Sequence, residues 1–235
     1  MKINLIGSCP SSGSTYISNL ISSHEDISAS PEYGIFSTNQ FYGKNWKRDF
    51  FKKNRICFPT QSHTHPYIRN LKYSGFTKER ISEIITNSKN QAEFMNNIAI
   101  NFNQNNFFNN KKVFYEKTPA NIFYVDKFLN IFPESHFIII LRNPVDTIKS
   151  LINRGYSFYI SSLTWLMSVS LLIKFKKFNN IKIIKYEQVV KNPNKFINNF
   201  LIKSNEDLNI KYDNNLYEKF LKNKSFKYPP YFVKS

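Results

Sequence analysis

The sequence predicts an α/β fold in which a central parallel sheet is flanked by helices. Near the start of the chain, the apolar run from Ile3 to Ile6 breaks at Gly7, passes through small residues and resumes at helical spacing. The run from His136 to Leu141 is apolar almost throughout, which is typical of a strand buried on both faces of a parallel sheet. Strands and helices alternate over the rest of the chain, and this order favours a parallel sheet.

Length and composition indicate one folded domain over residues 1–235. With 41% hydrophobic residues the chain can bury a sizeable core. The net charge of +17 comes from scattered lysines rather than one basic block, and no nucleic-acid-binding motif is present, so we expect no nucleic-acid partner. The two cysteines are too few for a disulfide framework or a zinc site.

The sequence predicts a cytoplasmic protein without a membrane span. The N-terminus lacks the charged, apolar and small-residue regions of a signal peptide. The longest apolar stretch, from Ile160 to Phe175, is interrupted by serine, threonine and lysine and falls short of a span. We expect a buried helix there. No feature of the sequence indicates an oligomeric state.

The first strand is followed by a turn made of small residues. Ser11, Ser12, Gly13, Ser14 and Thr15 supply hydroxyl groups and one residue that tolerates unusual backbone angles. The next helix directs its free N–H groups and its positive dipole end at this turn. The turn therefore predicts a phosphate or other oxyanion site, although packing alone would also favour small residues. No lysine follows Gly13, which disfavours an ordinary ATP or GTP loop.

The segment from residue 24 to 110 carries fewer signals. Pro31 and Gly34 indicate a loop, with a short strand before Pro31. Residues 41–72 have no clean periodicity, and we interpret 41–110 as a substrate-side insertion or lid with following helices. One or two helices are expected between Thr77 and Phe108.

The second half of the chain repeats the strand–helix order, and Pro144 suits the first turn of a helix. The expected strands are Val113–Glu116, His136–Leu141 and Ile181–Tyr186, and the expected helices are Ala120–Phe132, Val145–Asn153, Ser157–Phe178 and Pro193–Lys203.

The carboxyl ends of parallel strands share one crevice, so the residues that follow each strand should meet there. Besides the turn at 11–15, these are Lys117, Arg142 with Ser150 on the helix after it, and Tyr186. Such a set suits a ligand with two separate anionic groups. Each residue also has an ordinary explanation: Lys117 as a solvated lysine, Arg142 in an ion pair with Asp146 or Glu134, Ser150 as an exposed serine and Tyr186 as a packing residue.

At this point the chain resembles the sulfotransferases that use 3′-phosphoadenosine 5′-phosphosulfate (PAPS). Pro10 to Thr15 resembles the 5′-phosphosulfate loop of that family, and Arg142 with Ser150 resembles its 3′-phosphate motif. Glu116-Lys117-Thr118-Pro119 resembles the preceding segment of glycan-modifying and bacterial members, and Tyr186-Glu187 a late motif. The match spans residues 3–203 in order. It implies a sulfotransferase fold of the P-loop-like kind.

The resemblance implies a transferase that moves a sulfuryl group from PAPS to a hydroxyl or amine of a small-molecule or glycan acceptor, with no metal. Ser11 to Thr15, Arg142, Ser150 and Tyr186 would bind the nucleotide. Lys117 would stabilise charge, and Glu32, which matches the acidic position after the loop, would be the base. His24 is a rival base, with His63 and His65 as weaker ones.

The chain departs from the family at Ser11, where a lysine or arginine is usual. Two alternatives are open, and this departure favours only the second of them. One is a nucleotide-kinase-like phosphotransferase that requires magnesium and prefers ATP or GTP, which the missing loop lysine disfavours. The other is a non-catalytic nucleotide- or glycan-binding protein on the same fold.

Overall fold

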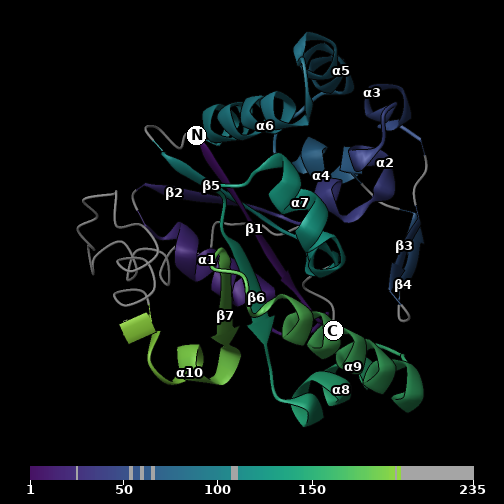
Figure 1. Ribbon diagram of the computed structural model, residues 1–235, viewed down its shortest axis with the longest axis vertical. Coiled ribbons are helices and arrows are strands. Elements are labelled where there is room, and N and C mark those ends of the chain that lie inside the picture. The colour runs from purple at the N-terminus through teal and green to yellow at the C-terminus, as the bar shows by residue number, and fades with distance from the viewer. Residues whose placement is uncertain are drawn as a thin grey trace.

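The computed structural model describes residues 1–196 except 25, 53–54, 59–60, 65–66, 107–110 and 194, and it leaves the side chains of 53–69 undescribed. A five-stranded sheet with strand order β2-β5-β1-β6-β7 lies at its centre (Figure 1). All four strand pairings in this sheet are parallel, as the sequence predicts. The strands are β1 (Lys2–Ser8), β2 (Ile27–Ser30), β5 (Val113–Lys117), β6 (Phe137–Leu141) and β7 (Ile181–Lys185).

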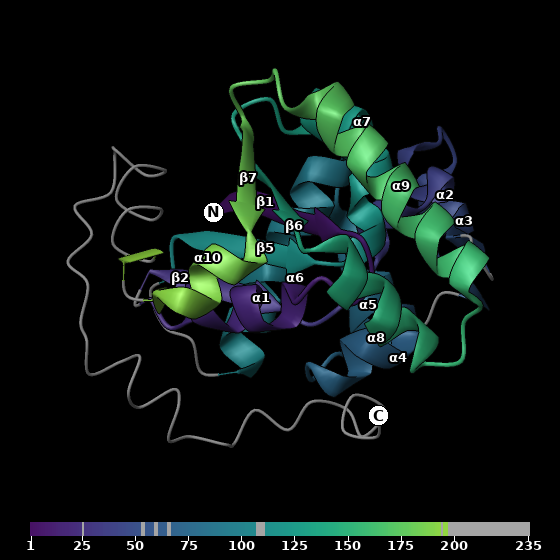
Figure 2. The same ribbon diagram turned by 90° about the horizontal axis from the view of Figure 1, so that it is seen from below.

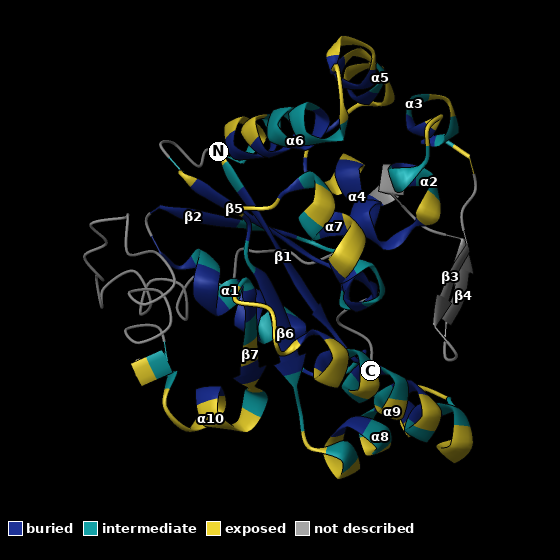
Figure 3. Cartoon of the chain, viewed as in Figure 1, coloured by how far each residue is buried: buried dark blue, intermediate teal, exposed yellow. Residues whose placement is uncertain are grey.

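Alternate side chains of the strands enter two separate cores, one on each face of the sheet. Leu5 and Phe137 pack in the larger core, whereas their neighbours Ile6 and Ile138 pack in the smaller one. The smaller core is covered by α1 (Ser14–Ser22) and α10 (Tyr186–Lys191). Figure 2 shows these two helices on one side of the sheet and α7 (Val125–Ile131) and α9 (Phe158–Phe175) on the other. Figure 3 shows the sheet as the most buried layer.

The helices over the larger core come from the middle and the later part of the chain. They are α6 (Gln91–Asn105), the 3₁₀ helix η2 (Pro119–Tyr124), α7 (Val125–Ile131) and α9 (Phe158–Phe175). The shorter α8 (Pro144–Ile152) lies against α9. The expected helix from Ala120 to Phe132 is therefore a 3₁₀ turn followed by an α-helix, which fits the proline at the start of the turn.

The segment at 35–87 contains more regular structure than its sequence indicates. It forms the 3₁₀ helix η1 (Ile35–Ser37), the helices α2 (Asn39–Tyr42), α3 (Trp46–Asp49), α4 (Tyr67–Tyr73) and α5 (Lys78–Asn87), and the antiparallel hairpin of β3 (Arg55–Phe58) and β4 (Gln61–Thr64). Aromatic rings hold its first part to α6, because Phe41, Trp46 and Phe50 all pack on Phe94. A lid function of this segment stays a prediction.

Two predicted elements differ from the structure, and a third is described only in part. Tyr186 begins α10 rather than ending β7. The apolar helix at Ile160–Phe175 is α9, but it is not a buried helix: only 28% of α9 is buried, and five of its large apolar side chains are exposed. By length and composition alone, α9 would be long enough to span a membrane. Most of the helix expected at Pro193–Lys203 falls outside the described residues.

Candidate functional site

In the described part of the chain no side-chain hydrogen bond caps the start of α1, so the N-terminus of this helix faces the turn after β1 without a cap. Ser11 and Gly13 both have positive φ angles, 66° and 82°, which bend the backbone tightly before the helix begins. Gly13 is the N-cap of α1, and no side chain caps the helix. Ser12 is buried, and its Oγ has no hydrogen-bond partner among the described residues. These features are those of an anion site.

The ring of Tyr186 packs against this turn and explains why position 13 is a glycine. A Cβ atom added to Gly13 would lie 2.1 Å from Cε2 of Tyr186, so no larger residue fits beneath the ring. The same ring lies edge-on to Tyr16 and carries the Arg142 guanidinium 4.9 Å from its centre. Tyr186 thus joins the turn to the end of β6 by a cation–π contact.

Lys117 occupies the centre of the site. It is the last residue of β5 and is 1% exposed, so it is not the solvated lysine of the ordinary explanation. Its Nζ lies 2.8 Å from Oε1 of Glu32 and donates at 3.2 Å to Oγ1 of Thr15. Glu32 keeps part of its side chain accessible, at 28%. A buried cation therefore connects the anion-binding turn with an accessible carboxylate.

Glu116, the neighbour of Lys117 on β5, holds the loop that carries Glu32. Its carboxylate is fully buried and accepts hydrogen bonds from the backbone N–H groups of Tyr33 and Gly34, both at 3.0 Å. Thr118 and Asn121 donate to the same carboxylate. Burial raises the pKa of Glu116, and these hydrogen bonds oppose the rise.

Arg142 is fixed at the end of β6 by contacts on several sides. Its Nη1 donates to the backbone oxygen of Ser11 at 2.8 Å, and its own carbonyl accepts from Nε1 of Trp165. It forms no ion pair with Asp146 or Glu134, so that explanation is wrong for the described structure. Its Nε is buried and has no partner among the described residues.

Arg154 also belongs to the site, although the sequence does not predict this. It follows α8, and its Nη1 donates to Oγ of Ser11 at 3.1 Å. Ser150 lies one helical turn earlier and is half-buried on α8. Arg154 lies in the turn beyond the end of α8, so helical spacing to Ser150 does not predict its contact with Ser11. Two arginines therefore contact Ser11.

The remaining nucleophile and base candidates are His24, His63, His65 and Cys9. His24 is buried between α1 and β2, at the amino end of the sheet, where its Nδ1 accepts from the N–H of Asp26. It is remote from the carboxyl ends, so the expectation of His24 as a rival base is wrong. His63 and His65 lie outside the described side chains. Burial raises the pKa of the Cys9 thiol to about 12, which makes it a poor nucleophile.

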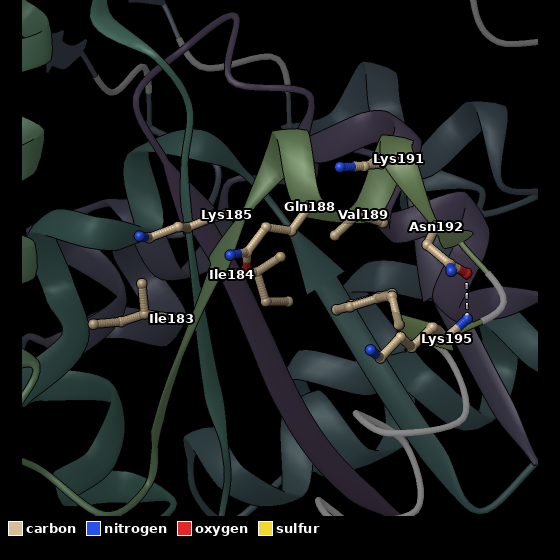
Figure 4. A pocket seen from close by; sticks show the side chains of 9 residues that line it. Ile183, Ile184, Lys185, Gln188, Val189, Lys191, Asn192 and Lys195 are labelled. Atoms are coloured by element: carbon tan, nitrogen blue, oxygen red, sulfur yellow. Dashed lines mark hydrogen bonds between the residues drawn. The ribbon is translucent and has the colours of Figure 1, made fainter.

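A pocket of about 680 Å³ opens beside β7 and α10 (Figure 4). None of the predicted site residues lines it. Its walls combine three lysines with apolar side chains, namely Ile183, Ile184, Lys185, Gln188, Val189, Lys191, Asn192, Lys195 and Phe196. It shares no lining residue with the turn at 11–15, so it is not part of the site described here.

The comparisons with known proteins bear on the family and the fold of the chain. A model of the sulfotransferase family matches residues 5–201. The comparison with curated proteins gave no match. Two solved structures share the fold at low identity. The sulfotransferase domain of the curacin biosynthetic pathway is 16% identical, with a TM-score of 0.60 over 92% of this chain and 76% of that domain.

The second is the sulfotransferase domain of an olefin synthase from Synechococcus PCC 7002, 15% identical, with a TM-score of 0.62 over 100% of this chain and 82% of that domain. At these identities the likeness establishes the fold, which is the P-loop-like α/β fold that the sequence predicts. The match of the family model covers most of the chain. The chain therefore belongs to the sulfotransferase family.

Proposed function

We propose that this protein transfers the sulfuryl group of PAPS to a hydroxyl or amine of a small-molecule or glycan acceptor. One observation carries the proposal: Lys117 Nζ contacts both Thr15 of the anion-binding turn and the Glu32 carboxylate. A cation between an oxyanion site and an accessible base is the arrangement that sulfuryl transfer needs. The family membership supports the transferase class.

The described residues suit a donor with two anionic groups. At one place the free N–H groups of α1 and the buried Ser12 hydroxyl provide donors for a phosphosulfate. At the other, the buried Nε of Arg142 has no partner in the described part of the chain, and Ser150 follows on α8. Arginine can form two parallel bonds with a phosphate. We assign the 5′-phosphosulfate to the turn and the 3′-phosphate to Arg142 with Ser150.

Sulfuryl transfer forms a bond between the acceptor oxygen or nitrogen and sulfur while the bond from sulfur to the phosphate oxygen breaks. Negative charge develops on that phosphate oxygen, and Lys117 is the cation placed to stabilise it. The attacking group loses its proton, and the Glu32 carboxylate receives it. By analogy with phosphoryl transfer, alignment of the two reactants supplies much of the remaining rate.

Arg154 can supply the positive charge that the loop lacks at Ser11. The family usually has lysine or arginine where this chain has Ser11, and here the Arg154 guanidinium reaches the Ser11 hydroxyl from the end of α8. Together with Arg142 on the Ser11 carbonyl, it brings positive charge to the same turn. We infer that Arg154 replaces the loop cation, which favours an active enzyme over a non-catalytic binding protein.

The experiment is a turnover assay with ³⁵S-labelled PAPS and a panel of sugars, phenols and amines. Formation of adenosine 3′,5′-bisphosphate together with a labelled acceptor is the expected result. A parallel reaction supplies γ-³²P-labelled ATP with magnesium and the same acceptors. Phosphoryl transfer from ATP without any use of PAPS would replace this proposal by the kinase alternative.

A further inference from the structure

The outer side of α9 is apolar and uncovered, contrary to the usual pattern of a surface helix. Phe158, Tyr159, Leu163, Leu166 and Ile173 are each between 47% and 82% exposed, and we call these five residues the α9 outer face. Tyr159, Leu166 and Ile173 are seven residues apart, or two helical turns, so they form one line along the helix.

The inner side of α9 explains why the apolar residues point outward. Ser161, Thr164 and Ser168 are buried toward the domain. The hydroxyls of Thr164 and Ser168 donate to carbonyls of their own helix, at 2.8 and 2.9 Å, so burial leaves them satisfied. Small inner residues let the helix lie close to the domain, and the large apolar residues are left for a different partner.

The stretch of sequence that contains this face, which lies between Asp146 and Glu187, carries charges of only one sign. No aspartate or glutamate occurs between residues 147 and 186. The same stretch contains seven basic residues: Lys149, Arg154, Lys174, Lys176, Lys177, Lys182 and Lys185. Lys176 and Lys177 follow Ile173 by three and four residues, so they continue the line of the α9 outer face beyond the end of the helix. A partner of this face must therefore accept both apolar side chains and positive charge.

We propose that the α9 outer face docks on an anionic membrane surface. A second copy of this chain would bring basic residues against basic residues, with no acidic residue in the stretch to neutralise them. An anionic lipid surface offers an apolar layer for the aromatic and aliphatic side chains, with negative headgroups for Lys174, Lys176 and Lys177 at the C-terminal end of α9. The long lysine side chains can reach those headgroups while their stems stay in apolar surroundings.

In this arrangement α9 lies in the interface plane and does not cross the membrane. Leu172 and Phe175 belong to the larger core, and Trp165 holds the Arg142 carbonyl. Inserting α9 across a bilayer would break these contacts and expose that core. The docking goes beyond the proposed function and does not depend on it.

The test is co-sedimentation of the whole chain with two kinds of vesicle, phosphatidylcholine alone and phosphatidylcholine mixed with phosphatidylglycerol. Binding to the mixed vesicles that weakens as salt is raised is the expected result for the natural chain. The Leu166→Gln/Ile173→Gln variant should bind at least about tenfold more weakly, since both substitutions remove apolar side chains from the lipid layer. The control is Ile100→Gln, an isoleucine on α6 that is 42% exposed and lies outside the α9 outer face.

A second pair separates the electrostatic contribution. Lys174→Glu/Lys177→Glu should lower binding to mixed vesicles, whereas Lys89→Glu, beyond the end of α5, should not. Binding that is equal for all variants, or no binding to either vesicle, would overturn the proposal. So would a dimer in analytical ultracentrifugation that Leu166→Gln/Ile173→Gln abolishes, because that result assigns the face to a second copy.

Discussion

Glu32 and Lys117 are 85 positions apart in the sequence, yet their side chains meet at 2.8 Å. The sheet causes this meeting, because β2 and β5 are parallel neighbours in which Ser30 pairs with Glu116. Glu32 lies two positions after Ser30, and Lys117 directly follows Glu116. Both residues therefore lie at the carboxyl end of the sheet. The catalytic assignment rests on this pairing.

The first prediction concerns the base. Glu32→Gln keeps the size of the side chain and removes its ability to take a proton, so the sulfuryl-transfer rate should fall by about 10²–10⁴-fold. Binding of adenosine 3′,5′-bisphosphate should stay within about twofold, since Glu32 does not belong to the proposed nucleotide contacts. Glu134→Gln, an exposed glutamate after α7, is the control. A fully active Glu32→Gln enzyme would move the base elsewhere.

Two adjacent residues of β5 perform different tasks because a strand alternates its side chains. Lys117 points into the site, and Glu116 holds the loop at Tyr33 and Gly34 from the other side. Glu116 is thus a positioning residue that acts through the loop. The sequence shows Glu116 only as part of a motif, because a linear pattern does not show that the N–H groups of Tyr33 and Gly34, 83 and 82 positions away, donate to its carboxylate.

At the scale of elements, the turn between β1 and α1 depends on Gly13 in two ways. Its φ of +82° is a conformation that other residues rarely adopt, and its missing side chain makes room for Tyr186. Gly155 has a similar φ of +90°, but a Cβ there would meet nothing within 4 Å. A side chain at Gly155 would cause backbone strain alone, whereas a side chain at Gly13 would also collide with the Tyr186 ring.

The second prediction uses that difference. Gly13→Ala should lower the free energy of unfolding by about 2–4 kcal/mol, and Gly155→Ala by about 1 kcal/mol. Urea denaturation followed by circular dichroism measures both values. Equal losses for the two variants would show that the Tyr186 ring moves aside without cost and does not support the turn.

The sequence predicted the elements whose pattern is set by burial. Both β1 and β6 were expected from apolar runs, and the structure confirms them. Other features depend on tertiary contacts. The buried Lys117 ammonium pairs with the carboxylate of Glu32, which is 85 positions away in the sequence. Arg154, which follows α8, contacts Ser11, which is 143 positions away. The exposed apolar side of α9 does not follow from the sequence, because apolar content alone predicts burial.

At the scale of the molecule, the sheet divides two cores, and Glu116 is a buried carboxyl at the site end of the larger one. Burial raises its pKa above the ordinary value of 4.5. The folded protein therefore holds a proton there at pH values where the unfolded chain has lost it. Stability from this group is present at low pH and declines as the pH rises from about 4.5 through the raised pKa.

The third prediction follows from that sign. The free energy of unfolding of the natural chain should fall with rising pH above about 4.5 more steeply than that of Glu116→Gln, which cannot release the proton. Urea denaturation across this pH range measures both slopes, with Glu134→Gln as the control. Parallel curves for the natural chain and Glu116→Gln would contradict the raised pKa.

The measurement that tests the central claim most directly is a calorimetric titration with adenosine 3′,5′-bisphosphate beside 5′-AMP. The account predicts that the bisphosphate binds more tightly, because only it presents the 3′-phosphate to Arg142. Arg142→Ala should weaken its binding by roughly tenfold to a hundredfold, since a charge-assisted hydrogen bond contributes about 1.5–3 kcal/mol. Arg48→Ala, an exposed arginine on α3, should leave the affinity unchanged. Equal affinity for both nucleotides, or an unchanged Arg142→Ala variant, would contradict the assignment of this site to PAPS.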